Sequence, residues 1–550
     1  MDVNNRKADR ALLVATWGLP SGWSCVRYIP PKFSDHELCK KPTEFEYSEH
    51  GGYYFSSTSA IYYELNRAGL DVKVVIIGQD TLVARCGGKP RQEQRQCCCD
   101  DEQCCCKGDD KKRVVDEKYC SDNEKLFEEI QRGKTVSYAD LRGRAEKVLR
   151  DYAGAYLGDD AHVDVIVLPG IGYYNGYVFD SPLENAKFVL AKELYDKLRN
   201  YKPDVVVLDI THGLNYIPAM TYSTIATLTK ALYVVKERPR CVYILNSDPV
   251  TQQSQCKDVR LNVVEVVDMK KEEITIKDML REIGEFNTAS VNIQTSDKRR
   301  GKEPDEELLN IIPKELLNII SDVRKNDKKL NELSQSYVKC LGNALEYGMM
   351  LYVAVKLSDK NFDNFVNYAK NQVDRLYEFI NKNVFIKYNN NTVVVSRPYA
   401  VNSDVMFQYV VSDILRHLKH EIMKCRDDTG VNGYDLVCLS EFVESIKVSK
   451  PVYVLFDHEA KKIMEISTKH PNIIVDVPKL LCEVYNEAEP VRCRRECKRC
   501  SPNQRDLIAH AGLEMTVTEV YKKANRVFVK YVEDDAERGP IPACIENHVC

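Results

Sequence analysis

The chain has 550 residues, more than one hydrophobic core usually serves, so we expect at least two domains. Its 44% hydrophobic and 29% charged residues exclude a largely disordered or collagen-like chain. The net charge of -4 excludes a globally basic nucleic-acid binder, so any contact with nucleic acid must come from a local patch.

Apolar runs in the sequence are too short for a membrane helix, which needs about 20 such residues. Residues 11–15 could imitate the core of a secretory signal, but the run ends at Trp17 and Gly18 without a small-residue cleavage site close behind. We interpret the run as a buried strand and expect a cytoplasmic protein.

From residue 11 to about residue 267, short apolar runs alternate with helix-like segments. Continuous apolar strands between helices are typical of a parallel sheet that helices cover on both faces. The sequence therefore predicts a Rossmann-like, doubly wound α/β domain that binds ligands at the carboxyl ends of its strands. The predicted strands are residues 11–16, 72–78, 163–168, 205–208, 241–245 and 261–267, and the predicted helices are residues 59–68, 123–153, 181–200 and 218–235.

A polar segment at about residues 86–122 interrupts this alternation and carries six cysteines between residues 97 and 106. We expect a loop insertion after the second strand that binds a metal, forms disulfides or is disordered. Three contiguous cysteines fit poorly around one tetrahedral zinc, because neighbouring side chains diverge, so a solvated or oxidised loop is the favoured interpretation.

Loops rich in glycine, hydroxyl and amide residues follow four of the predicted strands, at residues 16–23, 168–176, 209–218 and 246–249. Such loops allow close backbone approach, and the following helix start offers free N–H groups. Gly170 and Gly172 lack the third glycine of a dinucleotide fingerprint, and no GxxxxGK phosphate loop is present. This edge of the sheet is predicted to bind a nucleotide-like ligand through loops that match no standard nucleotide-binding motif. His212 has an alternative interpretation, as a structural histidine that caps the next helix.

From about residue 304, apolar residues recur at three- and four-residue spacing, which predicts a mostly helical domain. The predicted domains are residues 1–290 and 306–550, with a charged linker at residues 291–305. The predicted helices are residues 306–324, 328–357, 361–381 and 405–425, with β-like pieces at residues 383–396 and 452–456.

A local basic patch, with five basic residues between positions 492 and 499, precedes an Arg-x4-His pattern at Arg505 and His510. A solvated charged loop is the alternative interpretation of the patch. Two residues five positions apart lie about 140° apart around a helix. They could converge on a phosphate where two copies of the helix meet across a two-fold axis.

At this point the sequence resembles the CRISPR-associated ancillary ribonucleases of type III systems, which join a CARF sensor domain to a HEPN nuclease domain. HEPN nucleases share an Arg, a polar residue, three variable residues and a His, which residues 505–510 match, and residues 511–514 also resemble the family. The CARF part is similar through residues 15–18, 168–172 and 209–218. The CARF-like motifs lie in the first half of the chain and the HEPN-like motif lies in the second half, which is the domain order of this family.

The resemblance implies a homodimer, or a higher oligomer of dimers, that binds cyclic oligoadenylate, with tetra-adenylate favoured, and then cleaves single-stranded RNA without a metal or other cofactor. The ribose 2′-OH would attack the adjacent phosphorus and leave a 2′,3′-cyclic phosphate and a 5′-OH. Arg505 would stabilise the phosphorane charge, His510 would transfer protons, and Asp506 would orient Arg505. The candidate ligand contacts are Trp17, Gly18, Gly170, Ile171, Gly172, Thr211, His212, Gly213, Asn215 and Asn246.

Cysteines outside the family pattern leave a zinc site open at Cys493, Cys497 and Cys500, which would need a fourth ligand such as Cys482. Disulfides or unpaired thiols are the favoured interpretation. A second functional hypothesis is a nucleotide-sensing regulator that recruits protein or nucleic acid without cutting. A nicotinamide-dependent enzyme is disfavoured by the missing third glycine.

Overall fold

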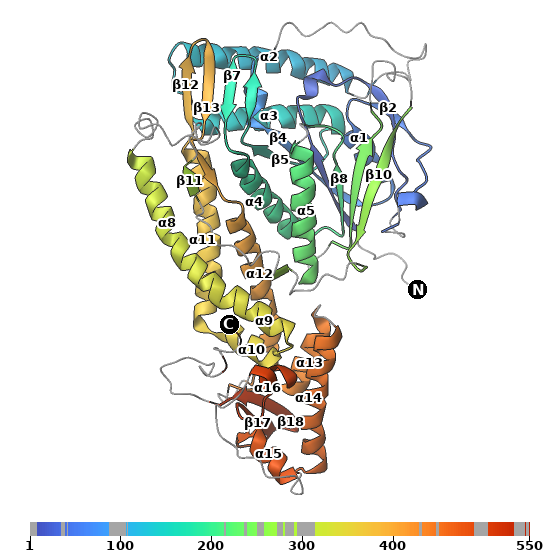
Figure 1. The fold of residues 1–550 in the computed structure, drawn as a ribbon. Helices are drawn as coiled ribbons and strands as arrows, with labels where there is room; N and C mark the ends of the chain where they lie inside the picture. The colour runs from blue at the N-terminus through green and yellow to red at the C-terminus, as the bar shows by residue number, and fades with distance from the viewer. Residues whose placement is uncertain are drawn as a thin grey trace. The chain divides into compact units, whose positions relative to one another are not determined.

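A computed structural model of the chain describes residues 8–34, 39–40, 42–86, 106, 108–213, 216–235, 239–249, 258–271, 279–280, 291–293, 314–427, 432–446, 450–488, 504–532, 545 and 549 (Figure 1). Two compact units alternate along the chain. The first unit comprises Met1–Glu272, Ala289–Val323 and Asp374–Ser403, and the second comprises Glu273–Thr288, Arg324–Val373 and Asp404–Cys550.

An eight-stranded sheet forms the centre of the first unit, in the order β3-β2-β10-β9-β8-β1-β4-β5. The five strands from β9 to β5 run parallel, whereas β10 is antiparallel to β9. Residues 11–15 of β1 are all completely buried, as expected for a strand covered on both faces. The bounds are β1 Arg10–Thr16, β2 Val26–Ile29, β3 Gly52–Tyr54, β4 Asp71–Gln79, β5 Val163–Leu168, β8 Val205–Asp209, β9 Cys241–Ser247 and β10 Asp258–Asp268.

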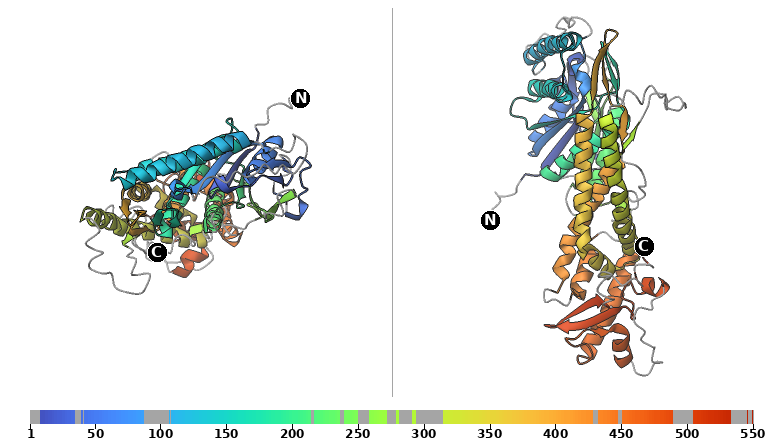
Figure 2. Two further views of the ribbon diagram at one scale, coloured as in Figure 1. Left: turned by 90° about the horizontal axis from the view of Figure 1, so that it is seen from above. Right: turned by 90° about the vertical axis from the view of Figure 1, so that its left-hand side faces the viewer.

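Helices cover both faces of this sheet, which confirms the doubly wound α/β prediction (Figure 1, and seen from above in Figure 2). Helices α1 (Ser57–Arg67) and α3 (Tyr138–Leu157) pack against β4 on one face. Helices α4 (Leu183–Tyr201) and α5 (Tyr216–Val234) pack against each other and against β5 and β1 on the other. All six predicted strands are present.

Two predictions for the region after β4 are wrong. Residues 109–122, expected as loop, begin the helix α2 (Asp109–Gln131), and the expected single helix at residues 123–153 is broken. Gly133, with φ of +83°, ends α2, and Ser137 caps α3 by accepting a hydrogen bond from the Asp140 N–H. The described cysteines here form the disulfides Cys25–Cys106 and Cys86–Cys120, whereas residues 87–105 lie outside the described residues.

A second sheet of the first unit joins segments that are far apart in the chain, in the order β12-β13-β7-β6. The hairpin of β6 (Gly172–Tyr174) and β7 (Tyr177–Asp180) follows β5, and β13 (Thr392–Ser396) pairs in parallel with β7. With β12 (Phe385–Asn389), β13 forms the β-like piece predicted at residues 383–396. A further pair joins β11 (Val291–Ile293) to β14 (Tyr399–Val401), and the rest of the predicted linker, residues 294–305, lies outside the described residues.

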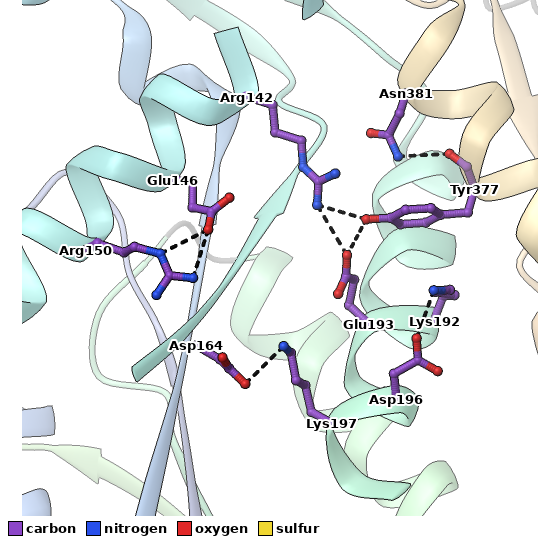
Figure 3. Close-up of polar contacts among 10 residues, drawn as sticks. All are labelled: Arg142, Glu146, Arg150, Asp164, Lys192, Glu193, Asp196, Lys197, Tyr377 and Asn381. Atoms are coloured by element: carbon purple, nitrogen blue, oxygen red, sulfur yellow. Dashed lines mark hydrogen bonds and ion pairs between the residues drawn. The ribbon is translucent and has the colours of Figure 1, made fainter. Parts of the chain in front are cut away.

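A polar cluster holds the end of helix α11 (Lys360–Lys382) to α3 and α4 (Figure 3). Arg142 donates to the Tyr377 hydroxyl over 2.9 Å and to Glu193 over 3.2 Å. The Tyr377 hydroxyl donates to the same Glu193 carboxylate. Residues 374–403 are thereby tied to the first unit by side chains as well as by strand pairing.

The second unit is mostly helical, as predicted, and contains a four-stranded sheet in the order β15-β18-β17-β16. The predicted helix at residues 328–357 is interrupted at Gly348, which has φ of +70°. Among the described residues, no helix is both long and apolar enough to cross a membrane. Helix α8 (Lys314–Ser334) belongs to the first unit up to Val323 and to the second unit from Arg324. The bounds of the other elements are a π-helical turn Gln335–Lys339, α9 Cys340–Glu346, α10 Met350–Ser358, α12 Asp404–Ile422, α13 Leu436–Ser445, α14 Lys450–Lys469, α15 Leu481–Ala488, α16 Gln504–Ala509, β15 Tyr434–Asp435, β16 Lys479–Leu480, β17 Thr518–Lys523 and β18 Arg526–Tyr531.

The β-like piece predicted at residues 452–456 is wrong, because these residues lie in α14. Val452, Phe456, Ala460 and Ile463 are buried and recur at three- and four-residue spacing, so they form one apolar face of a helix.

Candidate functional site

The carboxyl ends of β1 and β8 lie side by side, with Ala15 in register opposite Asp209. The two loops that follow are in close contact, since a Cβ atom on Gly18 would lie 3.6 Å from the Gly213 Cα atom. The Thr16 hydroxyl donates to the His212 carbonyl over 2.5 Å. Gly213 has φ of +117°, a conformation that favours glycine. The predicted edge is therefore a backbone-lined surface.

Asp209, at the end of β8, holds the loops of this edge by hydrogen bonds. Its buried carboxylate accepts hydrogen bonds from the hydroxyls of Ser57 and Thr58, over 2.7 and 2.8 Å, and from the Thr211 N–H over 3.1 Å. The Trp17 indole donates to the Thr58 hydroxyl over 3.0 Å. One carboxylate thus fixes the start of α1 and the loop after β8 together.

His212 lies between this network and an aromatic cluster. The Ser57 N–H donates to Nε2 over 3.3 Å, so that nitrogen carries no proton in this arrangement. The imidazole stacks on Trp23 with ring centroids 4.0 Å apart, and burial lowers the pKa of His212. A neutral imidazole can accept or donate a hydrogen bond but brings no charge to a phosphate. His212 contacts the start of α1, whereas the sequence had suggested that it might cap the next helix, which is α5.

The other predicted ligand contacts lie along the same edge but differ in how far their side chains are exposed. Trp17 is 1% exposed, so its side chain supports the edge from inside rather than facing a ligand. The Thr211 hydroxyl accepts from the Ser247 N–H over 3.2 Å, and Asn246 is exposed near the end of β9. Ile171 and Gly172 are half-buried after β5, and Asn215 lies outside the described residues.

The loop that contains Gly170 is anchored by a buried ion pair. The Gly170 N–H donates to Asp80 over 2.6 Å, and a Cβ atom at Gly170 would lie 2.3 Å from Thr81, so only glycine fits. Asp80 also accepts from the Tyr138 hydroxyl over 3.0 Å and from Arg397 over 3.4 Å. Both charged side chains are completely buried, and the Arg397 Nη1 atom has no hydrogen-bond partner in the described part of the chain.

In the second unit, the predicted catalytic residues lie on and just after the short helix α16. Arg505 and Asp506 are exposed, and His510 is half-buried directly after the last helical residue. The Gly512 N–H donates to the Leu507 carbonyl over 2.9 Å, which ends the helix at that point. One short element therefore presents the guanidinium, and its end presents the imidazole.

A buried glutamate holds His510. Glu459 of α14 is 5% exposed, and its Oε2 atom lies 3.2 Å from the His510 Nδ1 atom. Because a carboxylate only accepts, Nδ1 carries the proton in this bond. The Glu459 contact raises the pKa of His510, and the hydrogen bonds from His510 and Lys462 hold the pKa of Glu459 below its ordinary value despite burial.

The candidate contacts and catalytic residues did not include Asp209, Asp80 or Glu459, although Asp209 begins the predicted loop at residues 209–218. Glu459 had a signal in the sequence, since it lies three residues after Phe456 and four before Ile463, in the apolar face of α14. A lone acid in such a face needs a partner, because an unpaired buried charge is costly.

No three His, Cys, Asp or Glu side chains within the described ranges are placed to hold a metal ion. The candidate zinc ligands Cys493, Cys497 and Cys500 lie outside those ranges.

Comparisons with known families match both sites. The CARF-domain family model of the CRISPR system endoribonuclease Csx1 matches residues 12–249, and the HEPN-domain model of the same name matches residues 449–534. Together the two matches span more than half of the 550 residues. The chain belongs to the CRISPR-associated CARF–HEPN family. The CARF match contains the edge around Asp209, and the HEPN match contains Glu459 and His510.

The individual proteins that resemble this CARF–HEPN protein do so over a short stretch or at low sequence identity. The CRISPR system endoribonuclease Csx1 of Methanocaldococcus jannaschii is 31% identical over 120 residues, which are 21% of this chain and 25% of that protein. The match thus covers about a quarter of that relative's length. Enterococcus italicus Csm6, solved with cyclic hexa-2′-fluoro-hexa-dAMP, is 12% identical over 88% of this chain and 93% of its own, with a TM-score of 0.22. A likeness at that score adds nothing to the assignment.

Proposed function

We propose that this CARF–HEPN protein is an endoribonuclease of type III CRISPR antiviral defence that cleaves single-stranded RNA when cyclic oligoadenylate binds its CARF domain. One observation carries the proposal. Within the HEPN match, the exposed Arg505 precedes a half-buried His510 whose Nδ1 atom is held by the buried Glu459. The Glu459 contact fixes the imidazole at a partly open surface and leaves its Nε2 atom without a partner among the described residues.

The chemistry follows from the two side chains and the substrate. RNA carries its own nucleophile, the 2′-OH, so the protein must stabilise charge and move protons. The Arg505 guanidinium is a planar cation that can bind two phosphate oxygens as negative charge develops on them. His510, with its second ring nitrogen Nε2 unpaired among the described residues, can exchange a proton with the reacting oxygens. Asp506 would orient Arg505, and the products would carry 2′,3′-cyclic phosphate and 5′-OH ends.

Dimerisation is part of the proposal. Two-fold pairing of α16 would place an Arg505 and a His510 from each protomer around one scissile phosphate. The same symmetry suits a cyclic ligand lying across the CARF edge, which would meet Gly18, Thr211 and Gly213 of each protomer, whereas Gly170 is buried with its N–H donated to Asp80 and would only support the edge. Tetra-adenylate is the expected ring size. Activation then requires that the ligand bind the active arrangement more tightly than the inactive one.

The test uses the purified full chain with end-labelled single-stranded RNA and cyclic tri-, tetra- or hexa-adenylate. Cleavage should depend on one of these ligands, persist in EDTA, and leave 2′,3′-cyclic phosphate ends. His510→Ala should abolish cleavage and retain ligand binding by calorimetry. Thr211→Val with His212→Ala should raise the activator concentration for half-maximal cleavage at least tenfold. RNA that stays intact at every ligand dose would refute the nuclease and leave a sensing regulator.

A further inference from the structure

We infer that Glu459 is a positioning residue for RNA cleavage, which holds the His510 imidazole in one orientation and one tautomer; this inference rests on the proposed nuclease function. The geometry is direct, since the Oε2 atom of Glu459 lies 3.2 Å from the Nδ1 atom of His510. The two residues are 51 positions apart, with Glu459 in α14 and His510 directly after the end of α16, so the contact is a product of the tertiary fold.

The position of Glu459 is unusual for a carboxylate. Its side chain is 6% exposed on the same face of α14 as Phe456 and Ile463, which are 0% and 1% exposed. Transfer of an unpaired carboxylate to such a site is strongly unfavourable, so its pairing must compensate for burial. An apolar side chain would fill the same place without that cost.

Lys462 completes the arrangement from the same helix. Its ammonium group lies 2.7 Å from Oε1 of Glu459, whereas His510 uses Oε2. Each carboxylate oxygen therefore has one cationic or protonated partner, and the plane of the carboxylate is fixed by two contacts. Lys462 is 43% exposed and Glu459 is 6% exposed, so the lysine connects the buried carboxylate to the surface.

The consequence for His510 is a defined reactive atom. With Nδ1–H donated to Glu459, proton exchange with RNA falls to Nε2 on the opposite side of the ring. The charged groups that act on the imidazole are Glu459 and Glu514, which raise its pKa, and Lys462, which lowers it. The net direction is upward, so a larger fraction of His510 is protonated near neutral pH than for an exposed histidine.

The test compares Glu459→Gln with Glu465→Gln, the same substitution on an exposed part of α14, where Glu465 pairs with Lys469 at 3.1 Å. Glu459→Gln should lower kcat roughly 10- to 100-fold with little change in KM, because positioning of the acid–base group is lost while RNA binding remains. The limb of the pH–rate profile that reports His510 should move to lower pH. Glu465→Gln should match the wild type in both. An unchanged kcat and pH profile in Glu459→Gln would overturn the inference.

A second measurement does not depend on activity or on the folding of Glu459→Gln. The NMR titration of His510 in the wild-type chain, assigned by the loss of its signal in His510→Ala, should give a pKa above the ordinary value of 6.5. A pKa at or below that value would overturn the pairing with Glu459. If the titration shows the pairing but no activator produces cleavage, the proposed nuclease function fails and the catalytic role of Glu459 fails with it.

Discussion

Replacing Arg397 with methionine should be among the most destabilising single substitutions in the first unit. Arg397 and Asp80 are both completely buried with an N–O separation of 3.4 Å, and the guanidinium lies 4.3 Å from the centroid of the Tyr138 ring. In Arg397→Met the side-chain volume is largely kept, but the Asp80 carboxylate remains buried, and its remaining partners within the described part of the chain are the Tyr138 hydroxyl and the Gly170 N–H. Breaking a buried ion pair from one side costs about 3–5 kcal/mol, which is the expected loss of unfolding free energy.

The assay is urea unfolding of the full chain followed by tryptophan fluorescence. Both tryptophans of the chain, Trp17 and Trp23, belong to the first unit, so the signal follows that unit. A double variant, Asp80→Asn with Arg397→Met, should recover part of the loss because it removes the uncompensated charge.

Arg132→Met is the matched control, because the side chains of Arg132 and Glu128 are 75% and 46% exposed, and a pair open to solvent should contribute about 1 kcal/mol or less. A loss below about 1 kcal/mol in Arg397→Met would refute the view that this pair anchors the Gly170 loop.

Two further predictions concern the second unit. The pKa of His510 is raised in the folded protein, so its pairing with Glu459 stabilises the fold fully below the ordinary imidazole pKa of 6.5, and this stabilisation is lost as pH rises through the folded pKa of His510. The pKa of Glu459 is lowered, so the same pairing stabilises the fold above the ordinary carboxyl pKa of about 4.5, and this stabilisation is lost as pH falls through the folded pKa of Glu459. The difference in unfolding free energy between wild type and His510→Ala, measured by circular dichroism, should therefore be largest between pH 4.5 and 6.5, and a constant difference from pH 5 to pH 9 would contradict it. Replacing both cysteines of the Cys425–Cys438 disulfide with serine opens a 13-residue loop and should cost about 3 kcal/mol in oxidising buffer; an equal loss in reducing buffer would argue against a cross-link effect.

The central sheet could be predicted because its parallel strands are buried on both faces and so read as continuous apolar runs. Residues 11–15 and 205–208 show this pattern. The strands β2, β3, β6 and β7 were not predicted, since each has only three or four residues and no such run. The error at residues 452–456 has a different cause. The run Val-Tyr-Val-Leu-Phe resembles a buried strand, and its helical period becomes visible only when the window extends to Ile463.

The sequence could locate the candidate sites but could not identify the buried residues that hold them in place. The rule that ligands bind beyond the carboxyl ends of parallel strands places the loops after β1 and β8 at one edge. The groups that fix those loops come from elsewhere, since Asp209 bonds to Ser57, which is 152 positions away, and Asp80 pairs with Arg397, which is 317 positions away. No local pattern records such partners, and they require the fold.

The pairing of β13 with β7 has a practical consequence for anyone who wishes to isolate the sensor. A protein truncated at residue 290 would lack residues 374–403, which belong to the first unit. It would leave β7 with an open edge available to other chains, and Asp80 without Arg397. An autonomous form of the first unit would therefore need residues 374–403 as well, joined to the same chain or supplied as a separate peptide.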